Sequence, residues 1–484
     1  MSRAGTTYDD AERRIPQSRI QVTLAGASTT PYWLDDPSRP DPLPPLEGAT
    51  ATDLAVVGGG YTGLWTALMA KERNPDRRVV LLEGKRIGWA ASGRNGGFCE
   101  ASLTHGEANG EKHLPQETAR LQELGLENLQ QIADTVEKYG IDCGFEWTGT
   151  LSVATEDHQV EWLREDEGKD PDVVFLDRDA VRKELNSPLY RAGLWDKKST
   201  AMLHPARLAW GLQRACLASG VEIYEHTPVR SISAATGGNG PVRLTTDGGT
   251  VTAAKVALAT NVFPSLLKRT RLHTVPVYDY VLMTEPLTPE QLRAIGWHNR
   301  QGLSDLNNRF HYYRLATDPQ GHQRILFGGY DAVYHYGRQV KAEYDQREET
   351  FARLAAHFYA TFPQLESVKF THKWGGAIDT CSRFFSFFTT AYGGRVAYAA
   401  GYTGLGVGAT RFGANVLLDL LAGTPTERTR LQLVTKKPLP FPPEPLAWLG
   451  VKITTAAMIR SDRRQGRRGP WLKLMDAAGI GFDS

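Results

Sequence analysis

Long apolar runs are missing from this chain of 484 residues. No stretch approaches the ~18 consecutive uncharged apolar residues that a membrane-spanning helix needs. The N-terminus from Met1 to Ile20 is polar and lacks the apolar core of a signal peptide. We therefore expect a cytoplasmic protein with no transmembrane segment.

An excess of charge of one sign is also lacking, because 56 Lys and Arg are set against 54 Asp and Glu, a net charge of +2. This balance argues against nucleic-acid binding as the main function. Cysteine is scarce: the four cysteines, Cys99, Cys143, Cys216 and Cys381, are scattered and show no metal-ligand spacing. We therefore expect neither structural disulfides nor a metal site, which fits a reducing compartment.

Residues 53–83 contain a pattern typical of dinucleotide binding: an apolar strand, a glycine turn, a helix and a second apolar strand that ends in Glu83. Gly58, Gly60 and Gly63 form G-x-G-x-x-G, which gives a tight turn, close backbone approach to a pyrophosphate and close helix packing. Glu83 follows at the usual distance of about 20 residues, where it would accept hydrogen bonds from ribose hydroxyls. The alternative, an unrelated glycine turn, does not require the flanking strands or the acid.

Two later glycine-rich segments favour FAD over NAD. The first is Ala91 to Gly97, where backbone can run beside a large flat ring, and the second is Gly401 to Gly408, between a strand and a helix. Backbone N–H groups and a helix N-terminus at the second segment would stabilise the negative charge that a flavin acquires on reduction. We therefore predict FAD as the cofactor.

The nucleotide-binding segments alternate along the chain with segments that alternate apolar and polar residues like antiparallel strands. We predict an α/β (α+β) protein in which a Rossmann-like FAD-binding domain is interleaved with a mostly antiparallel-sheet substrate domain. The ligand should lie between the two. The predicted parts are an extended N-terminal arm (1–50), the FAD-binding domain (51–105, 186–274 and 375–435), the substrate domain (106–185 and 275–374) and a Pro-rich and basic tail (436–484).

These motifs together resemble the D-amino-acid oxidase, glycine oxidase and sarcosine oxidase (DAO) family of FAD-dependent oxidoreductases. The motifs that carry the resemblance are Gly58–Gly63, Glu83, Ser92–Gly97, His204-Pro205, Trp374-Gly375-Gly376 and Gly401–Gly406. The Ser-Gly-Arg-Asn-Gly-Gly version of the second glycine segment is most similar to gamma-glutamylputrescine oxidoreductase-like amine oxidases. The resemblance runs in order from about residue 30 to residue 425.

The resemblance implies oxidation of a C–N bond in a primary or secondary amine or amino acid, by hydride transfer to flavin N5, followed by imine hydrolysis. Reoxidation by O2, which yields H2O2, is expected. Two alternatives remain open: an amine dehydrogenase that uses a different electron acceptor, and a non-catalytic flavoprotein scaffold. The expected partners are a small amine substrate and O2, with no nucleic acid, and the protein is expected to be a monomer or a homodimer.

The predicted FAD site combines the glycine motifs with residues that follow them. It consists of Gly58, Gly60, Tyr61, Thr62, Gly63, Glu83, Gly84, Ser92, Arg94, Asn95, Gly96, Gly97, Val229, Thr260, Asn261, Gly401, Thr403, Gly404 and Gly406. Some relatives attach FAD to a cysteine near Cys381, but a buried free cysteine is the default, so we expect non-covalent FAD.

The predicted catalytic residues are Arg94, Tyr312 and Trp374, and the predicted substrate-binding residues are Tyr278, Tyr280, Tyr312 and Arg314. Arg94 falls where relatives place a group over the flavin, although a helix cap or phosphate contact is the alternative. Arg314 would bind a substrate carboxylate, or else form an ordinary salt bridge. The aromatic residues would receive an ammonium group by cation–π contact, or else pack within the sheet. The sequence shows no convincing general base.

The tail allows two interpretations. Its arginines, among them Arg460, Arg463 and Arg464, either form a solvated face packed across the FAD domain or belong to a peripheral membrane surface.

Overall fold

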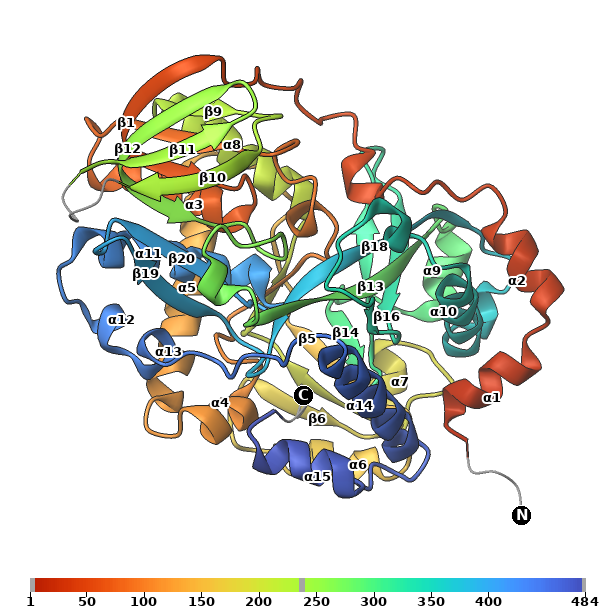
Figure 1. Ribbon diagram of the computed structural model, residues 1–484. Helices are drawn as coiled ribbons and strands as arrows, with labels where there is room; N and C mark the ends of the chain where they lie inside the picture. The colour runs from red at the N-terminus through yellow and green to blue at the C-terminus, as the bar shows by residue number, and fades with distance from the viewer. Residues whose placement is uncertain (1–4, 235–239, 481–484) are drawn as a thin grey trace.

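Two β-sheets organise the computed structural model, which describes residues 5–234 and 240–480 (Figure 1). The first has eight strands and contains the predicted nucleotide-binding segments, and the second has nine strands and is mostly antiparallel. The predicted fold class is thereby confirmed.

The eight-stranded sheet has the central order β10-β11-β12-β1-β2-β9, with β20 paired to β12 and β19 paired to β20. The β12-β1-β2-β9 neighbours and the β12–β20 pair are parallel, whereas β10, β11 and β19 join by antiparallel pairing. Its strands are β1 (Gly48–Val57), β2 (Val79–Leu82), β9 (Val221–Tyr224), β10 (Val229–Ala234), β11 (Val242–Thr246), β12 (Gly249–Leu258), β19 (Phe387–Ala391) and β20 (Val396–Ala400).

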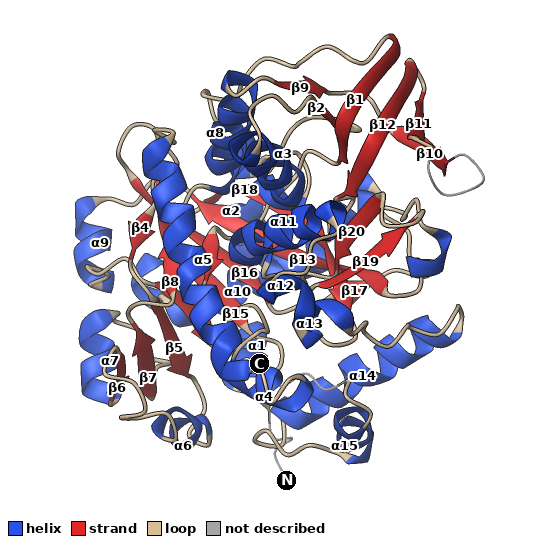
Figure 2. Ribbon diagram, turned by 90° about the vertical axis from the view of Figure 1, so that its left-hand side faces the viewer, coloured by secondary structure: helices blue, strands red, loops and turns tan. Residues whose placement is uncertain are grey.

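Long helices cover one face of this sheet. In Figure 2, α3 and α8 lie on the same side of β1 and β12. All ten residues from Tyr61 to Ala70 of α3 are buried, because the helix packs between its neighbours α8 and α11. The helices of this layer are α3 (Tyr61–Arg73), α5 (Thr118–Lys138), α8 (Pro205–Ala218) and α11 (Gly406–Ala422).

The nine-stranded sheet has the order β17-β13-β16-β15-β14-β5-β7-β6, with β18 on the other side of β13. The long pair β13 and β18 runs antiparallel from Thr274↔Cys381 to Thr284↔Phe370. The strands are β5 (Thr150–Ala154), β6 (Val173–Leu176), β7 (Ala192–Asp196), β13 (Thr274–Thr284), β14 (Gly302–Asp305), β15 (His311–Thr317), β16 (Gln323–Gly329), β17 (Val333–Tyr334) and β18 (Phe370–Cys381). A small third sheet contains β3 (Phe98–Glu100), β8 (Thr200–Met202) and β4 (Glu146–Trp147).

Two of the predicted domain boundaries differ from the strand pairing. Strand β7 pairs with β5 and β6 in the nine-stranded sheet, although 186–274 was assigned to the FAD-binding domain. Strand β18 continues as one strand across the boundary at 374/375. In both cases the sheet to which a strand belongs is decided by hydrogen bonding to strands far away in the sequence. The local residue pattern does not show which strand will be the partner.

The N-terminal segment is not a purely extended arm. It contains α1 (Thr7–Arg14) and α2 (Gln17–Leu24), and both helices pack against α10 (Glu348–Thr361) at the right of Figure 1. A capping box between Thr6 and Asp9 begins α1, and the apolar side chains Tyr8 and Ile20 are buried in the substrate-side core. Both short helices are stabilised because their apolar residues pack against α10.

The C-terminal tail also contains helices, α14 (Leu446–Asp462) and α15 (Pro470–Ala477). The prediction that this tail packs across the FAD domain is wrong for α14, which is fixed to the substrate side. Asp462 accepts hydrogen bonds from Asn308 at 2.9 and 2.6 Å, and Arg463 pairs with Asp9. The remaining short helices are α4 (Glu107–His113), α6 (Gln159–Arg164), α7 (Arg178–Glu184), α9 (Pro289–Ile295), α12 (Glu427–Arg430) and α13 (Gln432–Thr435).

Candidate FAD and substrate site

One large cavity, about 2040 Å³ in volume, is lined by residues of both main sheets. This volume exceeds the 300–1,000 Å³ typical of a small-molecule pocket. It leaves room for a dinucleotide and a substrate together.

The turn after β1 forms the nucleotide end of the cavity. Gly58 has φ +111°, and its N–H donates to Leu82 O at 2.8 Å, which joins the ends of β1 and β2. A Cβ atom on Gly63 would lie only 1.8 Å from Gly58 O, so α3 can approach the strand only with glycine there. Gly58, Gly60, Tyr61 and Thr62 line the cavity, whereas Gly63 supports the turn from beneath.

Glu83 lies at the end of β2 and is 7% exposed. Its carboxylate accepts from the N–H of Gly59 at 2.6 Å, the N–H of Lys85 at 2.7 Å and the indole N–H of Trp89 at 2.9 Å. Burial raises the pKa of this carboxyl, and these donors oppose the shift. A carboxylate has about four acceptor positions, so Glu83 keeps capacity for a ribose hydroxyl.

Two predicted FAD residues supply polar atoms without partners. Among the described residues, Thr260 Oγ1 and Asn261 Oδ1 are buried side-chain atoms with no hydrogen bond, and both residues line the cavity. Asn261 also has the left-handed φ of +50° that is shared by Thr403 on the opposite loop. Unpaired buried polar atoms and strained backbone are features of ligand sites. These observations fit a polar dinucleotide in this part of the cavity.

The other predicted FAD residues divide into a lining set and a supporting set. Gly84, Ser92, Arg94, Asn95, Gly96, Val229, Thr403, Gly404 and Gly406 line the cavity. Of the described residues that were predicted, Gly97 and Gly401 do not line it, like Gly63 above. Gly401 N–H donates at 2.6 Å to Asp379, a cavity-lining carboxyl whose pKa burial raises to about 6.

Arg94 lies where the two sheets meet. Its guanidinium donates to Asp345 at 2.5 Å and to Gly375 O at 3.1 Å, while its Nε donates to Trp89 O at 2.9 Å. Asp345 comes from the short helix Ala342–Asp345, so Arg94 joins the glycine segment to the substrate side.

Trp374 and Arg314 have different surroundings from those predicted. Trp374 is 1% exposed and donates its indole N–H to Arg94 O at 2.9 Å, and Arg314 donates to Leu203 O at 2.7 Å and Gly97 O at 3.1 Å. Neither is among the described residues that line the cavity. Arg314 is held by backbone carbonyls and does not face the cavity as a carboxylate clamp.

Tyr278 and Tyr280 also face away from the cavity. Their hydroxyls donate to Lys341 O and Tyr344 O, and both rings belong to the core beneath the nine-stranded sheet. Alternate residues of a strand face opposite sides, so Val277, Asp279 and Val281 of the same strand line the cavity instead. The sequence predicted the correct strand but the wrong face.

Asp279 is the residue that the sequence analysis missed. It lines the cavity, and Tyr312 donates its hydroxyl to Asp279 Oδ2 at 2.5 Å. Burial raises the pKa of Asp279 to about 6 and raises the pKa of Tyr312 well above its ordinary value. The signal was the acid at the centre of Tyr278-Asp279-Tyr280, which we interpreted through its flanking tyrosines.

The Asp279–Tyr312 pair is close to the first glycine segment, Ser92 to Gly97, and to Gly376. Asp279 is opposite Gly376 on β18, where an added Cβ would lie 3.6 Å from Arg94 Cδ. An added Cβ on Gly96 would lie 2.8 Å from the Tyr312 ring. Tyr312, which was predicted to shape the substrate pocket, lines the cavity beside Gly96.

Cys381 is buried, and its Sγ donates to Phe385 O at 3.1 Å and to Gly401 O at 3.4 Å. It is not one of the described cavity-lining residues. The neighbouring His105 does line the cavity, with Nε2 2.6 Å from Thr403 O, and burial lowers its pKa.

The glycine turn in one sheet and a second sheet that lines the same cavity have the arrangement of a dinucleotide-binding protein with room for a second ligand. The family model "FAD dependent oxidoreductase" (DAO) matches residues 53–420. The chain therefore belongs to the DAO family of FAD-dependent oxidoreductases, and FAD is its cofactor, as predicted.

Curated relatives are similar over most of their length. Gamma-glutamylputrescine oxidoreductase of Escherichia coli is 32% identical over 82% of this chain and 89% of the relative. A probable oxidoreductase, OrdL, of Haemophilus influenzae is 29% identical over 81% of this chain and 88% of the relative.

Solved structures share the fold. Glycine oxidase from Geobacillus kaustophilus superposes with a TM-score of 0.63 at 20% identity, covering 78% of this chain and 96% of that one. L-amino acid deaminase from Proteus myxofaciens gives a TM-score of 0.62 at 17% identity, covering 82% and 96%. Among residues 5–234 and 240–480, no helix is both long and apolar enough to cross a bilayer.

Proposed function

We propose that this protein oxidises the C–N bond of a primary or secondary amine or an amino acid. The observation that carries the proposal is the buried Asp279 carboxyl, hydrogen-bonded to Tyr312 in the same cavity as the FAD cradle. An ammonium group is the natural partner of a buried carboxylate in an apolar cavity.

Asp279 would bind the substrate ammonium and take its proton, because an amine must be neutral to release hydride. A pKa of about 6 leaves this carboxyl ionised at neutral pH and places it within reach of proton transfer. Tyr312 holds the carboxylate in place, and Arg94 holds the ring-proximal backbone through Gly375 O. When bound, FAD supplies the hydride acceptor.

We further propose that the imine product is hydrolysed in water and that O2 reoxidises the cofactor to yield H2O2. FAD would be held without a covalent bond, because Cys381 is hydrogen-bonded away from the cavity. The residues holding FAD would be the lining residues already described, from Gly58 to Gly406, and the protein would act in the cytoplasm. The second candidate function is an amine dehydrogenase that uses an electron acceptor other than O2. The same cavity would hold FAD and the amine substrate in that enzyme too.

The test is the visible spectrum of the purified, dialysed protein, followed by aerobic peroxide detection with a panel of amines. The panel contains gamma-glutamylputrescine, polyamines, N-methyl amines and amino acids, chosen partly from the names of the relatives. Flavin bands and peroxide with one substrate class support the oxidase. Anaerobic bleaching by a substrate without aerobic peroxide supports the dehydrogenase, and the absence of bleaching with every amine contradicts both.

A further inference from the structure

The helices α14 and α15 and the segment before them expose an unusual amount of apolar surface. Of the 14 large apolar side chains that are exposed on the described residues, six come from positions 439–474, a small part of the chain. Leu446 and Leu474 are each 59% exposed. These six are Leu439, Leu446, Trp448, Leu449, Ile453 and Leu474. Leu446 also lines the cavity, so we call the other five the outer apolar face.

Helix α14 is apolar on two sides, of which the inner one borders the cavity and the outer one is exposed. Leu449, Ile453 and Ala456 are exposed at the three- and four-residue spacing of one helix face. Val451 and Met458 line the cavity from the opposite side. A helix that serves only as a cavity wall would carry polar residues on its outer side. The outer side of α14 therefore has the composition of a surface that meets a further apolar phase.

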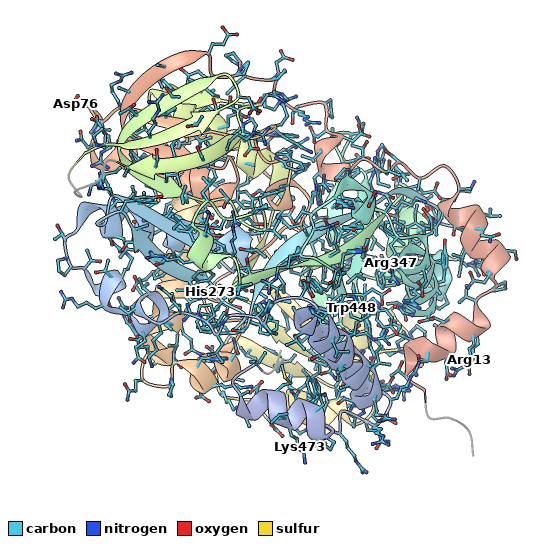
Figure 3. The ribbon with its side chains drawn as sticks, viewed as in Figure 1. Arg13, Asp76, His273, Arg347, Trp448 and Lys473 are labelled. Atoms are coloured by element: carbon cyan, nitrogen blue, oxygen red, sulfur yellow. The ribbon has the colours of Figure 1, made fainter. Side chains whose placement is uncertain are left out.

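Basic side chains surround this face. Arg460, Arg464, Arg467 and Lys473 are exposed, and within the described part of the chain no carboxylate forms an ion pair with any of them at 4.0 Å or less. Figure 3 shows Trp448 on α14 and Lys473 at the lower edge of α15.

The acidic residues of the same segment are already engaged. Glu444 accepts from Tyr334, Asp462 from Asn308, and Asp476 from Arg468. The outward charge of this segment is therefore positive, although the whole chain is nearly neutral at +2.

We propose that the outer apolar face docks on an anionic lipid bilayer. Leucine, isoleucine and tryptophan side chains would enter the boundary between headgroups and acyl chains, while lysine and arginine would contact anionic headgroups. Tryptophan is well suited to this boundary because its ring is apolar and its N–H is polar. The surface is a ridge: in Figure 2, α14 and α15 stand out from the body at the lower right.

A second copy of the chain fits this surface less well. A twofold contact places the same patch on both sides of the interface. The unpaired cations around α14 would then face one another, and like charges in close contact are unfavourable. An anionic bilayer satisfies the apolar residues and the cations together.

Docking would have a consequence for access to the site. Because the inner side of α14 lines the cavity, that end of the cavity would lie at the lipid surface. This inference concerns location alone and holds for an oxidase and for a dehydrogenase.

The experiment is co-sedimentation of the full-length, FAD-loaded protein with vesicles. One set contains phosphatidylcholine alone, and the other an equal mixture of phosphatidylcholine and phosphatidylglycerol. We expect at least roughly tenfold stronger partitioning to the anionic vesicles, weakened by raised salt. The double variants L449E/I453E and R460E/R464E should each lose most of this binding.

Matched controls come from exposed residues elsewhere. Leu126→Glu on α5 and Arg243→Glu on β11 should bind like the unaltered protein. The flavin spectrum and Tm of each variant establish that it is folded. Three outcomes would overturn the proposal: equal partitioning to both vesicle types, equal loss in the control variants, or no vesicle binding together with a dimer that L449E/I453E dissociates.

Discussion

At the scale of single residues, the proposed chemistry depends on the carboxylate of Asp279. Its surroundings are apolar on β13, with Val277 and Val281 as its neighbours on the cavity side. Burial raises its pKa while the Tyr312 hydroxyl opposes the shift. A group tuned in this way is typical of an acid–base site.

Substitution Asp279→Asn should lower kcat/KM for the amine by roughly 100-fold or more, the usual contribution of a general base. The amide keeps the shape and can still accept from Tyr312, so FAD content and Tm should stay close to those of the unaltered protein. Steady-state kinetics beside the flavin spectrum make the measurement. Tyr280→Phe, whose hydroxyl lies away from the cavity, is the matched control and should change kcat/KM little.

The pH profile gives an independent check. Because the carboxylate form takes the proton, kcat/KM should rise with pH until the carboxyl is ionised, with a midpoint at the Asp279 pKa of about 6. Below the midpoint the decline should approach about tenfold per pH unit. This acidic limb should be absent from Asp279→Asn, and its persistence there would assign it to another group.

The residue scale also shows where the sequence analysis failed. The pattern at Tyr278-Asp279-Tyr280 predicted a strand, and β13 confirms it. Which side faces the cavity depends on what packs against each face, and α10 covers the side of the tyrosines. Asp279 lies on one face of β13 and the two tyrosines lie on the other, so alternation alone does not reveal which face meets the cavity.

At the scale of elements, the turn between β1 and α3 was the most predictable part. Each of its glycines is required for a different local reason: Gly58 adopts a positive φ, and Gly63 permits close contact between the helix and the strand. Such requirements are imposed by neighbouring residues and leave a short sequence signature.

Gly63→Ala should destabilise the fold and lower FAD content. The added Cβ would lie 1.8 Å from Gly58 O, and overpacking of this kind costs about 1–3 kcal/mol. Thermal unfolding and the ratio of flavin to protein absorbance measure the two effects. Gly450→Ala is the control: nothing lies within 4 Å of its Cβ position, so Tm should hold or rise. A Gly63→Ala protein with normal Tm and full FAD would contradict this account.

At the scale of the whole molecule, the cavity exists because two sheets contribute to it. Residues from the β1–α3 turn and from β13, β15 and β18 line one continuous space. A ligand in this space contacts both sheets at once, so its binding energy stabilises their arrangement.

FAD should therefore raise the Tm of the apoprotein. At a free concentration of about 100 times its Kd, the expected stabilisation is about 2.7 kcal/mol. Differential scanning fluorimetry of FAD-depleted protein with increasing FAD measures it. At the same ligand concentration AMP, which would occupy only the nucleotide end, should give a smaller Tm shift than FAD. An equal shift would show that contacts with the second sheet add nothing to binding.

The sequence by itself determined the dinucleotide turn, the FAD cofactor, the family and the interleaving of two sheet-forming regions. These properties depend on residues close together in the chain, through glycine conformation, alternation and helix termini. Only the tertiary structure decided that Asp279 faces the cavity, that Arg314 and Trp374 hold backbone carbonyls, and that β7 joins the nine-stranded sheet. The physical reason is that burial and long-range pairing depend on what each surface meets, and a local pattern does not specify its partner.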